Sequence, residues 1–251
     1  MKNIVISCLL TTILFALCNN EEKSIYQQMG LDSNAPLNTL TEKETAAGWV
    51  LLFNGIDFTG WHGFNMTGIP SEWSIEDGTM TMAYVDSEES QDVITDKIYK
   101  DFILFLEYKM TSQANSGVLF QVKEDPAYRY PYETGPEIQI IDDLGWPGKL
   151  EDWQMHGSNY AMYVAEGEFN KPVGEWNTIL LVVNNNQVTQ YVNEVKVVEY
   201  EKYTDDWTQR RNSGKWNDYP DYGKFDEGHI SLQNHGTQVF FRNIKLKELN
   251  K

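Results

Sequence analysis

The chain has 251 residues, of which 41% are hydrophobic and 13% aromatic, so it can bury one sizeable core. Its formal net charge of −17 argues against a nucleic-acid partner, because phosphate binding requires basic patches. Both cysteines, Cys8 and Cys18, lie near the N-terminus, which leaves the rest of the chain without a disulfide, a thiol nucleophile or a thiolate metal site.

Residues 1–18 have the pattern of an export signal. Met1-Lys2-Asn3 is a positively charged start, and residues 4–17 form an apolar run shorter than the ~20 residues of a membrane span. Cys18 at the end of this run predicts a lipoprotein, although Leu17 is larger than the residue that usually precedes an acylated cysteine. Plain secretion and an unprocessed cytoplasmic start are the alternatives. We therefore expect export to the periplasm or cell surface, with membrane contact only through a lipid anchor.

Residues 19–46 lack a hydrophobic period and include Gly30 and Pro36, which is typical of a tether. Near their end, Thr41-Glu42-Lys43-Glu44 forms a capping-box pattern and predicts a single helical turn. One domain over residues 47–250 is expected to follow.

From Trp49 onward the chain consists of short runs in which apolar and polar residues alternate, separated by turns. Asp77-Gly78 joins two such runs and is a strong hairpin signal. Further strands are predicted over residues 102–110, 116–122, 137–141, 178–183, 188–192, 195–200, 229–234 and 238–246. No long helical period interrupts them. The pattern therefore predicts an all-β sandwich, or jelly roll, of two antiparallel sheets.

Three of these strands carry polar side chains opposite an apolar face. The apolar sets are Val118, Phe120 and Val122; Ile138 and Ile140; and Ile230 and Leu232. If these residues enter the core, the opposite faces bring together Gln121, Glu137, Gln139, Gln233 and His235. Amide, carboxylate and imidazole groups suit a hydroxyl-rich ligand, although one polar face is also ordinary for an antiparallel sheet.

Several motifs, taken in order, resemble the 3-keto-disaccharide hydrolase family of exported bacterial proteins. They are Gly48-Trp49-Val50-Leu51-Leu52-Phe53-Asn54-Gly55 with Gly60-Trp61, Asn115-Ser116-Gly117-Val118, Glu137-Ile138-Gln139-Ile140-Ile141-Asp142, Gly174-Glu175-Trp176-Asn177, and Gly228-His229-Ile230-Ser231-Leu232-Gln233-Asn234-His235-Gly236 with Phe241-Arg242-Asn243-Ile244. The resemblance covers residues 41–249 and implies a concanavalin A-like sandwich. It also implies cleavage of glycosides already oxidised to a ketone at C3 of a glucosyl unit. One departure is Asn234, where relatives often carry Asp.

Cleavage beside a ketone can proceed by elimination, which needs a base for the C2 proton, an acid for the C1 oxygen and donors for the ketone oxygen. Glu137 and His235 are the candidates for acid and base, in either order. The candidate substrate-binding residues are Asn115, Gln121, Gln139, Asp142, Lys215, Gln233, Arg242 and Trp153. Each also has an ordinary structural interpretation: Asn115 as a strand-entry turn, for example, and Arg242 as part of a buried salt bridge. Trp146, Trp207 and Trp216 also lie in loop-like segments, where one or two tryptophans could stack on a sugar.

Two other functions stay open. Glu137-x-Gln139-x-x-Asp142 also resembles the catalytic strand of laminarinase-type retaining glycosidases, which need two carboxyl groups ~5–5.5 Å apart. That interpretation is weakened because those enzymes carry two glutamates around an aspartate. Here the middle acid is replaced by Gln139, and the last acid is the shorter Asp142. A non-catalytic carbohydrate-binding module would use the same polar face. We expect a small carbohydrate ligand, no cofactor and no catalytic metal; Asp142-Asp143 could bind a structural calcium ion, and the oligomeric state is left open.

Overall fold

The computed structural model describes residues 23–86 and 90–249. The predicted signal peptide and Cys18 lie outside these residues. Within the described ranges, no helix is long and apolar enough to cross a membrane.

The larger of two sheets has eight strands and forms one layer of the molecule. They are β1 (Trp49–Leu51), β3 (Trp73–Glu76), β4 (Thr79–Met82), β6 (Phe102–Met110), β9 (Trp176–Asn184), β10 (Gln187–Val192), β11 (Val195–Glu201) and β13 (Val239–Glu248). Their order is β11-β10-β9-β6-β13-β4-β3, and β1 also pairs with β13. The predicted hairpin is confirmed, since β3 and β4 pair around Asp77 and Gly78.

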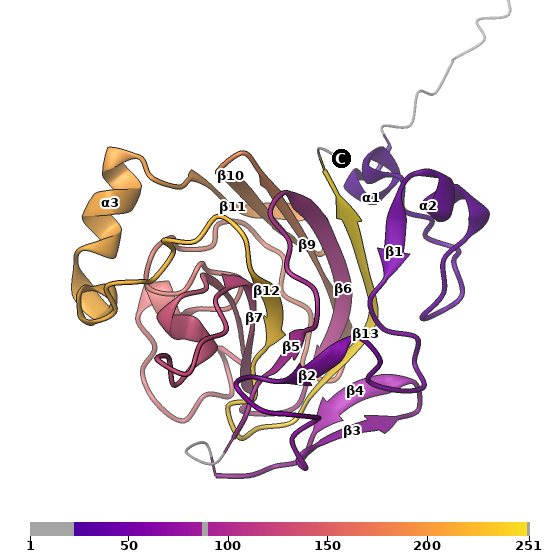
Figure 1. Cartoon of the computed structure of the whole chain (residues 1–251), viewed down its shortest axis with the longest axis horizontal. Helices are drawn as coiled ribbons and strands as arrows, with labels where there is room; N and C mark the ends of the chain where they lie inside the picture. Colours follow the sequence, from indigo (N-terminus) through magenta and orange to yellow (C-terminus); the bar gives the residue numbers. More distant parts are fainter. Residues whose placement is uncertain (1–22, 87–89, 250–251) are drawn as a thin grey trace, which may run out of the picture.

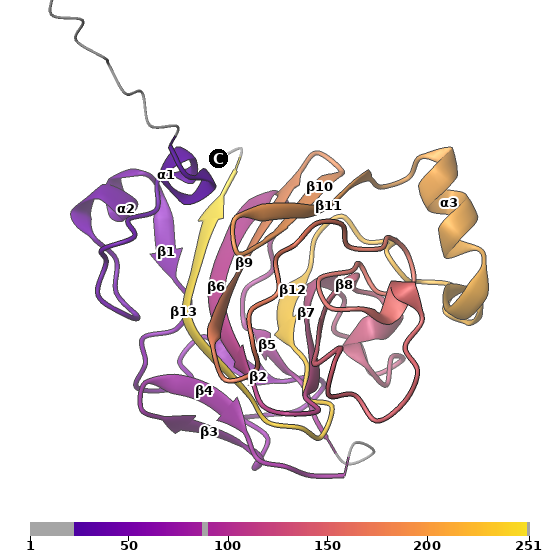
Figure 2. The same cartoon turned by 180° about the vertical axis from the view of Figure 1, so that it is seen from behind.

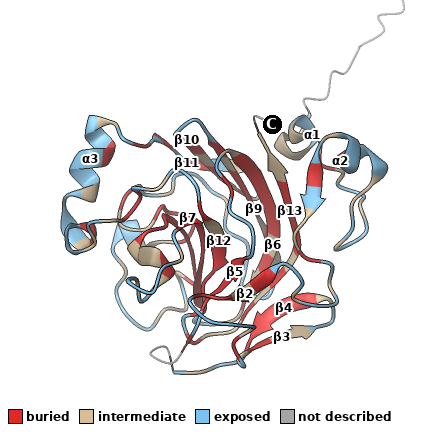
Figure 3. Cartoon of the chain, viewed as in Figure 1, coloured by how far each residue is buried: buried red, intermediate tan, exposed pale blue. Residues whose placement is uncertain are grey.

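The second sheet has five strands and carries the polar face. They are β2 (Trp61–Gly63), β5 (Val93–Thr95), β7 (Asn115–Val122), β8 (Glu137–Ile141) and β12 (His229–Leu232), in the order β2-β5-β12-β7-β8. All pairings in both sheets are antiparallel. The two sheets face each other in Figures 1 and 2 and enclose one large core. The predicted two-sheet sandwich is confirmed, and Figure 3 shows most strands buried while the outer helices are largely exposed.

The tether prediction is wrong for residues 23–46, which pack against the larger sheet. Helix α1 (Ile25–Met29) places Tyr26 against Phe105, and its hydroxyl bonds to Thr178. Helix α2 (Glu42–Ala46) begins with the predicted capping box. Its Glu44 forms a fully buried salt bridge with Lys245 of β13, with 2.8 Å between the charged atoms. The packed domain therefore begins near residue 23 rather than 47.

Most of the predicted strand faces are confirmed. Ile138, Ile140, Ile230 and Leu232 lie in the inter-sheet core, as do Val118 and Phe120. The end of β7 differs, because Gln121 has a positive φ of 53° and the pairing with β12 shifts register between His229 and Ser231. This bulge turns Val122 to the outer face. Gln121 turns the other way, and its amide bonds the buried Lys202 (2.5 Å) and the carbonyl of Asp226 (2.7 Å).

Candidate active site

Glu137 lies on the outer face of the five-stranded sheet, on β8 next to β7. Val118 pairs with Ile138, so Gly117 and Leu119 flank the Glu137 side chain. A Cβ atom at Gly117 would lie 2.8 Å from Cγ of Glu137, which shows that this glycine provides the space for the carboxyl group. Burial raises the pKa of Glu137 to about 7, against the opposing effects of the Lys215 charge and a hydrogen bond from Gln233. At neutral pH Glu137 is therefore close to half ionised.

The close approach of Gly117 predicts the effect of one small substitution. In Gly117→Ala, the new methyl group has to push the Glu137 carboxyl aside, while the ordinary backbone of β7 is retained. We expect turnover to fall by ~10²-fold, because small misplacements of a catalytic group have effects of this size. Steady-state kinetics tests this, with circular dichroism to confirm folding. Unchanged turnover would contradict the placement of Glu137.

Lys215 reaches the same face from a segment distant in sequence. This segment consists of helix α3 (Asp205–Arg211) and the 3-10 helix η3 (Gly214–Asp218). The buried side chains of Trp207 and Trp216 fix it against the rest of the fold. Trp216 stacks on Tyr222 at 3.7 Å between ring centroids, and Trp207 stacks on Tyr200 at 5.2 Å. Both tryptophans are 1% exposed, so the interpretation of either as a sugar platform is wrong.

The Lys215 ammonium group lies over two tyrosine rings that line the site. It is 4.6 Å from the ring centroid of Tyr132 and 4.5 Å from that of Tyr160. Burial lowers its pKa, while the charge of Glu137 opposes that effect. The segment around Lys215 thus covers part of the site and places a cation in the same cavity wall as the buried Glu137 carboxyl group.

These groups line a cavity of about 100 Å³. Its walls are Asn115, Tyr132, Glu137, Gln139, Ile141, Trp146, Leu150, Gln154, Tyr160, Lys215, Gln233 and His235. Gln139 is 3% exposed, and its Oε1 has no hydrogen-bond partner within the described part of the chain. Buried polar atoms are usually paired, so an unpaired oxygen in a cavity wall indicates that a ligand donates to it.

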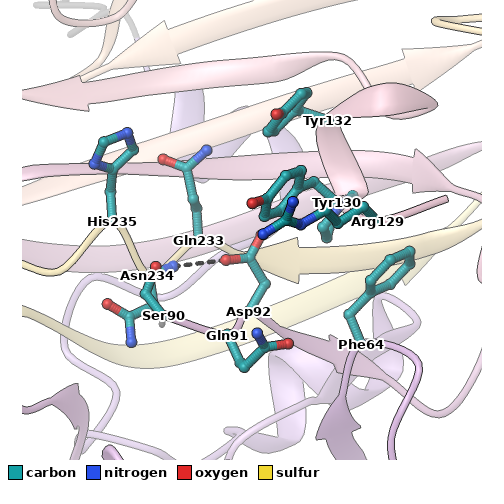
Figure 4. A pocket seen from close by; sticks show the side chains of 11 residues that line it. Phe64, Ser90, Gln91, Asp92, Arg129, Tyr130, Tyr132, Gln233, Asn234 and His235 are labelled. Carbon is teal, nitrogen blue, oxygen red and sulfur yellow. Dashed lines mark hydrogen bonds between the residues drawn. The ribbon is translucent and has the colours of Figure 1, made fainter. Parts of the chain in front are cut away.

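A second cavity, of about 180 Å³, adjoins the first and shares Tyr132, Gln233 and His235 with it. Figure 4 shows Asp92, Gln233, Asn234 and His235 on one side and Tyr130, Tyr132 and Phe64 on the other. His235 is exposed where the cavities meet. Desolvation by the surrounding walls lowers its pKa, and the charge of Lys215 acts in the same direction. The imidazole is therefore mainly neutral at pH 7.

Sequence reasoning did not identify Asp92, which immediately precedes β5. Its carboxylate accepts a 2.8 Å hydrogen bond from the backbone N–H of Asn234. Burial raises the pKa of Asp92 to about 8, so the group is largely protonated at neutral pH. A single aspartate before a three-residue strand is not part of any recognisable sequence motif, so nothing in the sequence is a reason to select it. Only the pairing of Val93 with Leu232 places it beside Gln233.

Several predicted site residues lie elsewhere. Arg242 bonds Glu107 (2.7 Å) and covers the Trp176 ring on the larger sheet, so its salt-bridge interpretation holds. Gln121 bonds the buried Lys202 at the β7 bulge. Trp153 lies in the 3-10 helix η2 (Asp152–Gln154), is 37% exposed and packs edge-on against Tyr160, a residue of the cavity wall. The carboxylate of Asp142 accepts from the backbone N–H groups of Gln113 and Gly145, which makes it a turn brace.

The two aspartates considered for a structural calcium ion both accept hydrogen bonds from backbone N–H groups. No group of three or more His, Cys, Asp or Glu side chains there is arranged to hold an ion. Asp143, the second residue of the pair considered for calcium, accepts from the backbone N–H of His156 and from Asn170. His156 is a core residue bonded to Tyr108, and burial lowers its pKa to about 4.

Comparison with known proteins places the chain in a family. Residues 48–247 match the model of the 3-keto-alpha-glucoside-1,2-lyase-like domain, which is most of the chain. The chain belongs to this family. A 3-keto-disaccharide hydrolase of Bacteroides thetaiotaomicron is 28% identical, and the match covers 98% of each chain. This lyase-like domain is also similar to a crystal structure of a candidate glycosyl hydrolase from Parabacteroides distasonis, with 43% identity, a TM-score of 0.80 and coverage of 86% of this chain and 100% of that one. A second such structure from that organism, at 24% identity and a TM-score of 0.62 over 80% of this chain and 99% of the other, shares the fold.

Proposed function

We propose that the protein is an exported enzyme that cleaves the glycosidic bond of 3-keto-glucosides by elimination, followed by hydration. The observation that carries this proposal is the buried Glu137 carboxyl group, which shares one cavity with the Lys215 cation and an accessible His235. The family match and the relative named 3-keto-disaccharide hydrolase support it.

Glu137 is suited to take the proton from C2 of the oxidised sugar. Its carboxylate form is well populated near pH 7, and its raised pKa makes it a stronger base than an ordinary glutamate. Loss of this proton places negative charge on the C3 oxygen. The Lys215 ammonium group in the same cavity would stabilise that charge, since fixed cations act strongly in a partly desolvated site.

His235 would serve the oxygen at C1. When the C2 electron pair forms the C1=C2 bond, the C1–O bond breaks and the leaving oxygen takes a proton from the imidazolium form. Water then adds at C1 and gives a proton to the neutral imidazole, while C2 is reprotonated by Glu137. The lowered pKa and the exposed position of His235 suit this exchange.

Direct displacement by a second carboxylate has less support. Asp142 is occupied by backbone donors, and Asp92 adjoins β5 while Glu137 lies on β8. Three strand spacings, about 14 Å between backbones, separate these positions in the sheet. Retaining glycosidases need carboxyl groups only ~5–5.5 Å apart.

Deuterated water tests the elimination route. We expect cleavage of 3-keto-trehalose or another 3-keto-glucoside in D₂O to give a product with deuterium at C2, detected by mass spectrometry and NMR. The unoxidised sugar should not react, because its C2 proton is too weakly acidic for a side-chain base. Product without label at C2 would refute elimination and favour displacement. Sugar binding without any product would favour a binding module.

Export and acylation at Cys18 are also proposed, on the charged start and the apolar run of residues 4–17. In protein purified from its own host, we expect residues 1–17 to be absent and Cys18 to carry lipid. Intact mass spectrometry measures both. A mature chain that retains Met1 would exclude this processing.

A further inference from the structure

The cavity beside Asp92 has polar atoms that the fold leaves unpaired. Within the described ranges, Nδ2 of Asn234 and Oε1 of Gln233 have no hydrogen-bond partner, although the residues are only 3% and 7% exposed. Both residues line this cavity. Buried polar atoms are rarely left unpaired because burial removes their hydrogen bonds to water, so their presence in a cavity wall indicates a ligand that both donates and accepts hydrogen bonds.

The opposite wall is aromatic. Tyr130 and Tyr132 stack on each other at 5.1 Å in and beside the 3-10 helix η1 (Pro131–Glu133), and Phe64 closes one end. A cavity with hydrogen-bonding groups on one side and ring faces or edges on the other suits a pyranose, whose hydroxyl groups and C–H faces have the same division.

The position of the cavity specifies which ring it would hold. It shares Tyr132, Gln233 and His235 with the Glu137 cavity, and His235 is the group assigned to the C1 oxygen of the scissile bond. A ring in the second cavity would therefore be attached through that oxygen.

We infer that the Asp92 cavity is the subsite for the sugar that leaves, with Asn234, Gln233 and Asp92 binding its hydroxyl groups against the Tyr130 wall. This inference rests on the proposed function for the identity of the first ring. The ring in this cavity is then the second sugar of a 3-keto-disaccharide, the substrate class that the relative's name gives. The protonated Asp92 carboxyl group adds a hydrogen-bond donor to this wall without a negative charge, and Arg129 adds donors from the Tyr130 side.

The test compares two substrates in two tyrosine variants. Tyr130 is half-buried, so Tyr130→Ala removes its ring from the wall, while Tyr130→Phe keeps the ring. For Tyr130→Ala we expect KM for 3-keto-trehalose to rise about tenfold, equivalent to one lost aromatic contact. For methyl 3-keto-glucoside, which lacks the second ring, kcat/KM should change by less than about twofold, since the wall is not used. Tyr130→Phe should restore wild-type KM.

Tyr84→Ala provides the matched comparison. Tyr84 is 82% exposed and lines a different cavity that also reaches His235. A selective loss on 3-keto-trehalose in Tyr84→Ala, with none in Tyr130→Ala, would overturn the inference by placing the leaving sugar there. Equal losses on both substrates in Tyr130→Ala would overturn it as well.

Binding separates this inference from the proposed function. Calorimetric titration with unoxidised trehalose and with glucose needs no turnover. We expect Tyr130→Ala to weaken trehalose binding about tenfold and to leave glucose binding unchanged. If no keto-sugar is cleaved but this pattern is found, the proposed reaction fails and the cavity stands as a sugar-binding subsite without a leaving group. If keto-sugars are cleaved and trehalose binding does not depend on Tyr130, the subsite fails alone.

Discussion

Glu137→Gln is expected to lower kcat on a 3-keto-glucoside by ~10²–10⁴-fold, the usual effect of losing a general acid–base group. The substituted amide has nearly the same shape but cannot accept the C2 proton. Affinity for the keto-sugar should change far less, because a proton-transfer group acts mainly in the transition state. Stopped-flow and steady-state kinetics measure the first effect, and calorimetry the second. His235→Ala should give a loss in the same range.

The pH profile of kcat/KM tests the same role of Glu137. Glu137 acts as a carboxylate with a pKa of about 7, while His235 donates as the imidazolium form and its pKa is lowered. The kcat/KM of the wild type should therefore be bell-shaped, with a rising limb at acidic pH and a fall above about 7, where the pair loses its last proton. This rising limb should be absent in Glu137→Gln. Glu199→Gln is the matched control, because Glu199 is a surface partner of Lys196 on β11. Full activity in Glu137→Gln would remove Glu137 from the mechanism.

Lys245→Met is expected to lower the free energy of unfolding by ~3–5 kcal/mol, because it leaves a buried charge without its partner. The affected group is Glu44, which is 0% exposed and also accepts from the backbone N–H groups of Thr41 (2.9 Å) and Asp32 (3.2 Å). Burial by itself would raise the pKa of Glu44, but these bonds and the one from Lys245 hold it below its usual value. Urea unfolding at neutral pH measures the loss.

Two variants make this stability prediction specific. Lys196→Met breaks an exposed salt bridge and should cost at most ~1 kcal/mol. Adding Glu44→Gln to Lys245→Met removes the unpaired charge and should restore most of the stability. Because the folded pKa of Glu44 is lowered, the wild-type pair contributes above the ordinary glutamate pKa, and this contribution is lost as pH falls through the lowered value. A Lys245→Met protein as stable as Lys196→Met would show that residues 23–46 are not held by this pair.

The amino-acid sequence by itself determined the sandwich and much of its polar face. Regular alternation in β8 and β12 assigns Ile138 and Ile230 to the core, and it therefore places Glu137 and Gln233 on the outer face. This inference is reliable because side chains in an extended strand alternate with a period of two. It fails at Gln121, where a bulge inserts one residue and reverses the faces, and nothing in the surrounding alternation signals that bulge.

Other members of the site depended on tertiary structure. Lys215 reaches Glu137 because buried contacts of Trp207 and Trp216 fix a segment with no strand period. Asp92 joins the site through the pairing of β5 with β12, whose residues lie about 140 positions apart in the chain, and Arg242 is placed by its contact with Glu107. Local propensity determines which residues alternate along one strand. Which strands become neighbours, and which loop covers them, is decided by long-range packing of the core, and this packing turned a polar face into two adjoining cavities.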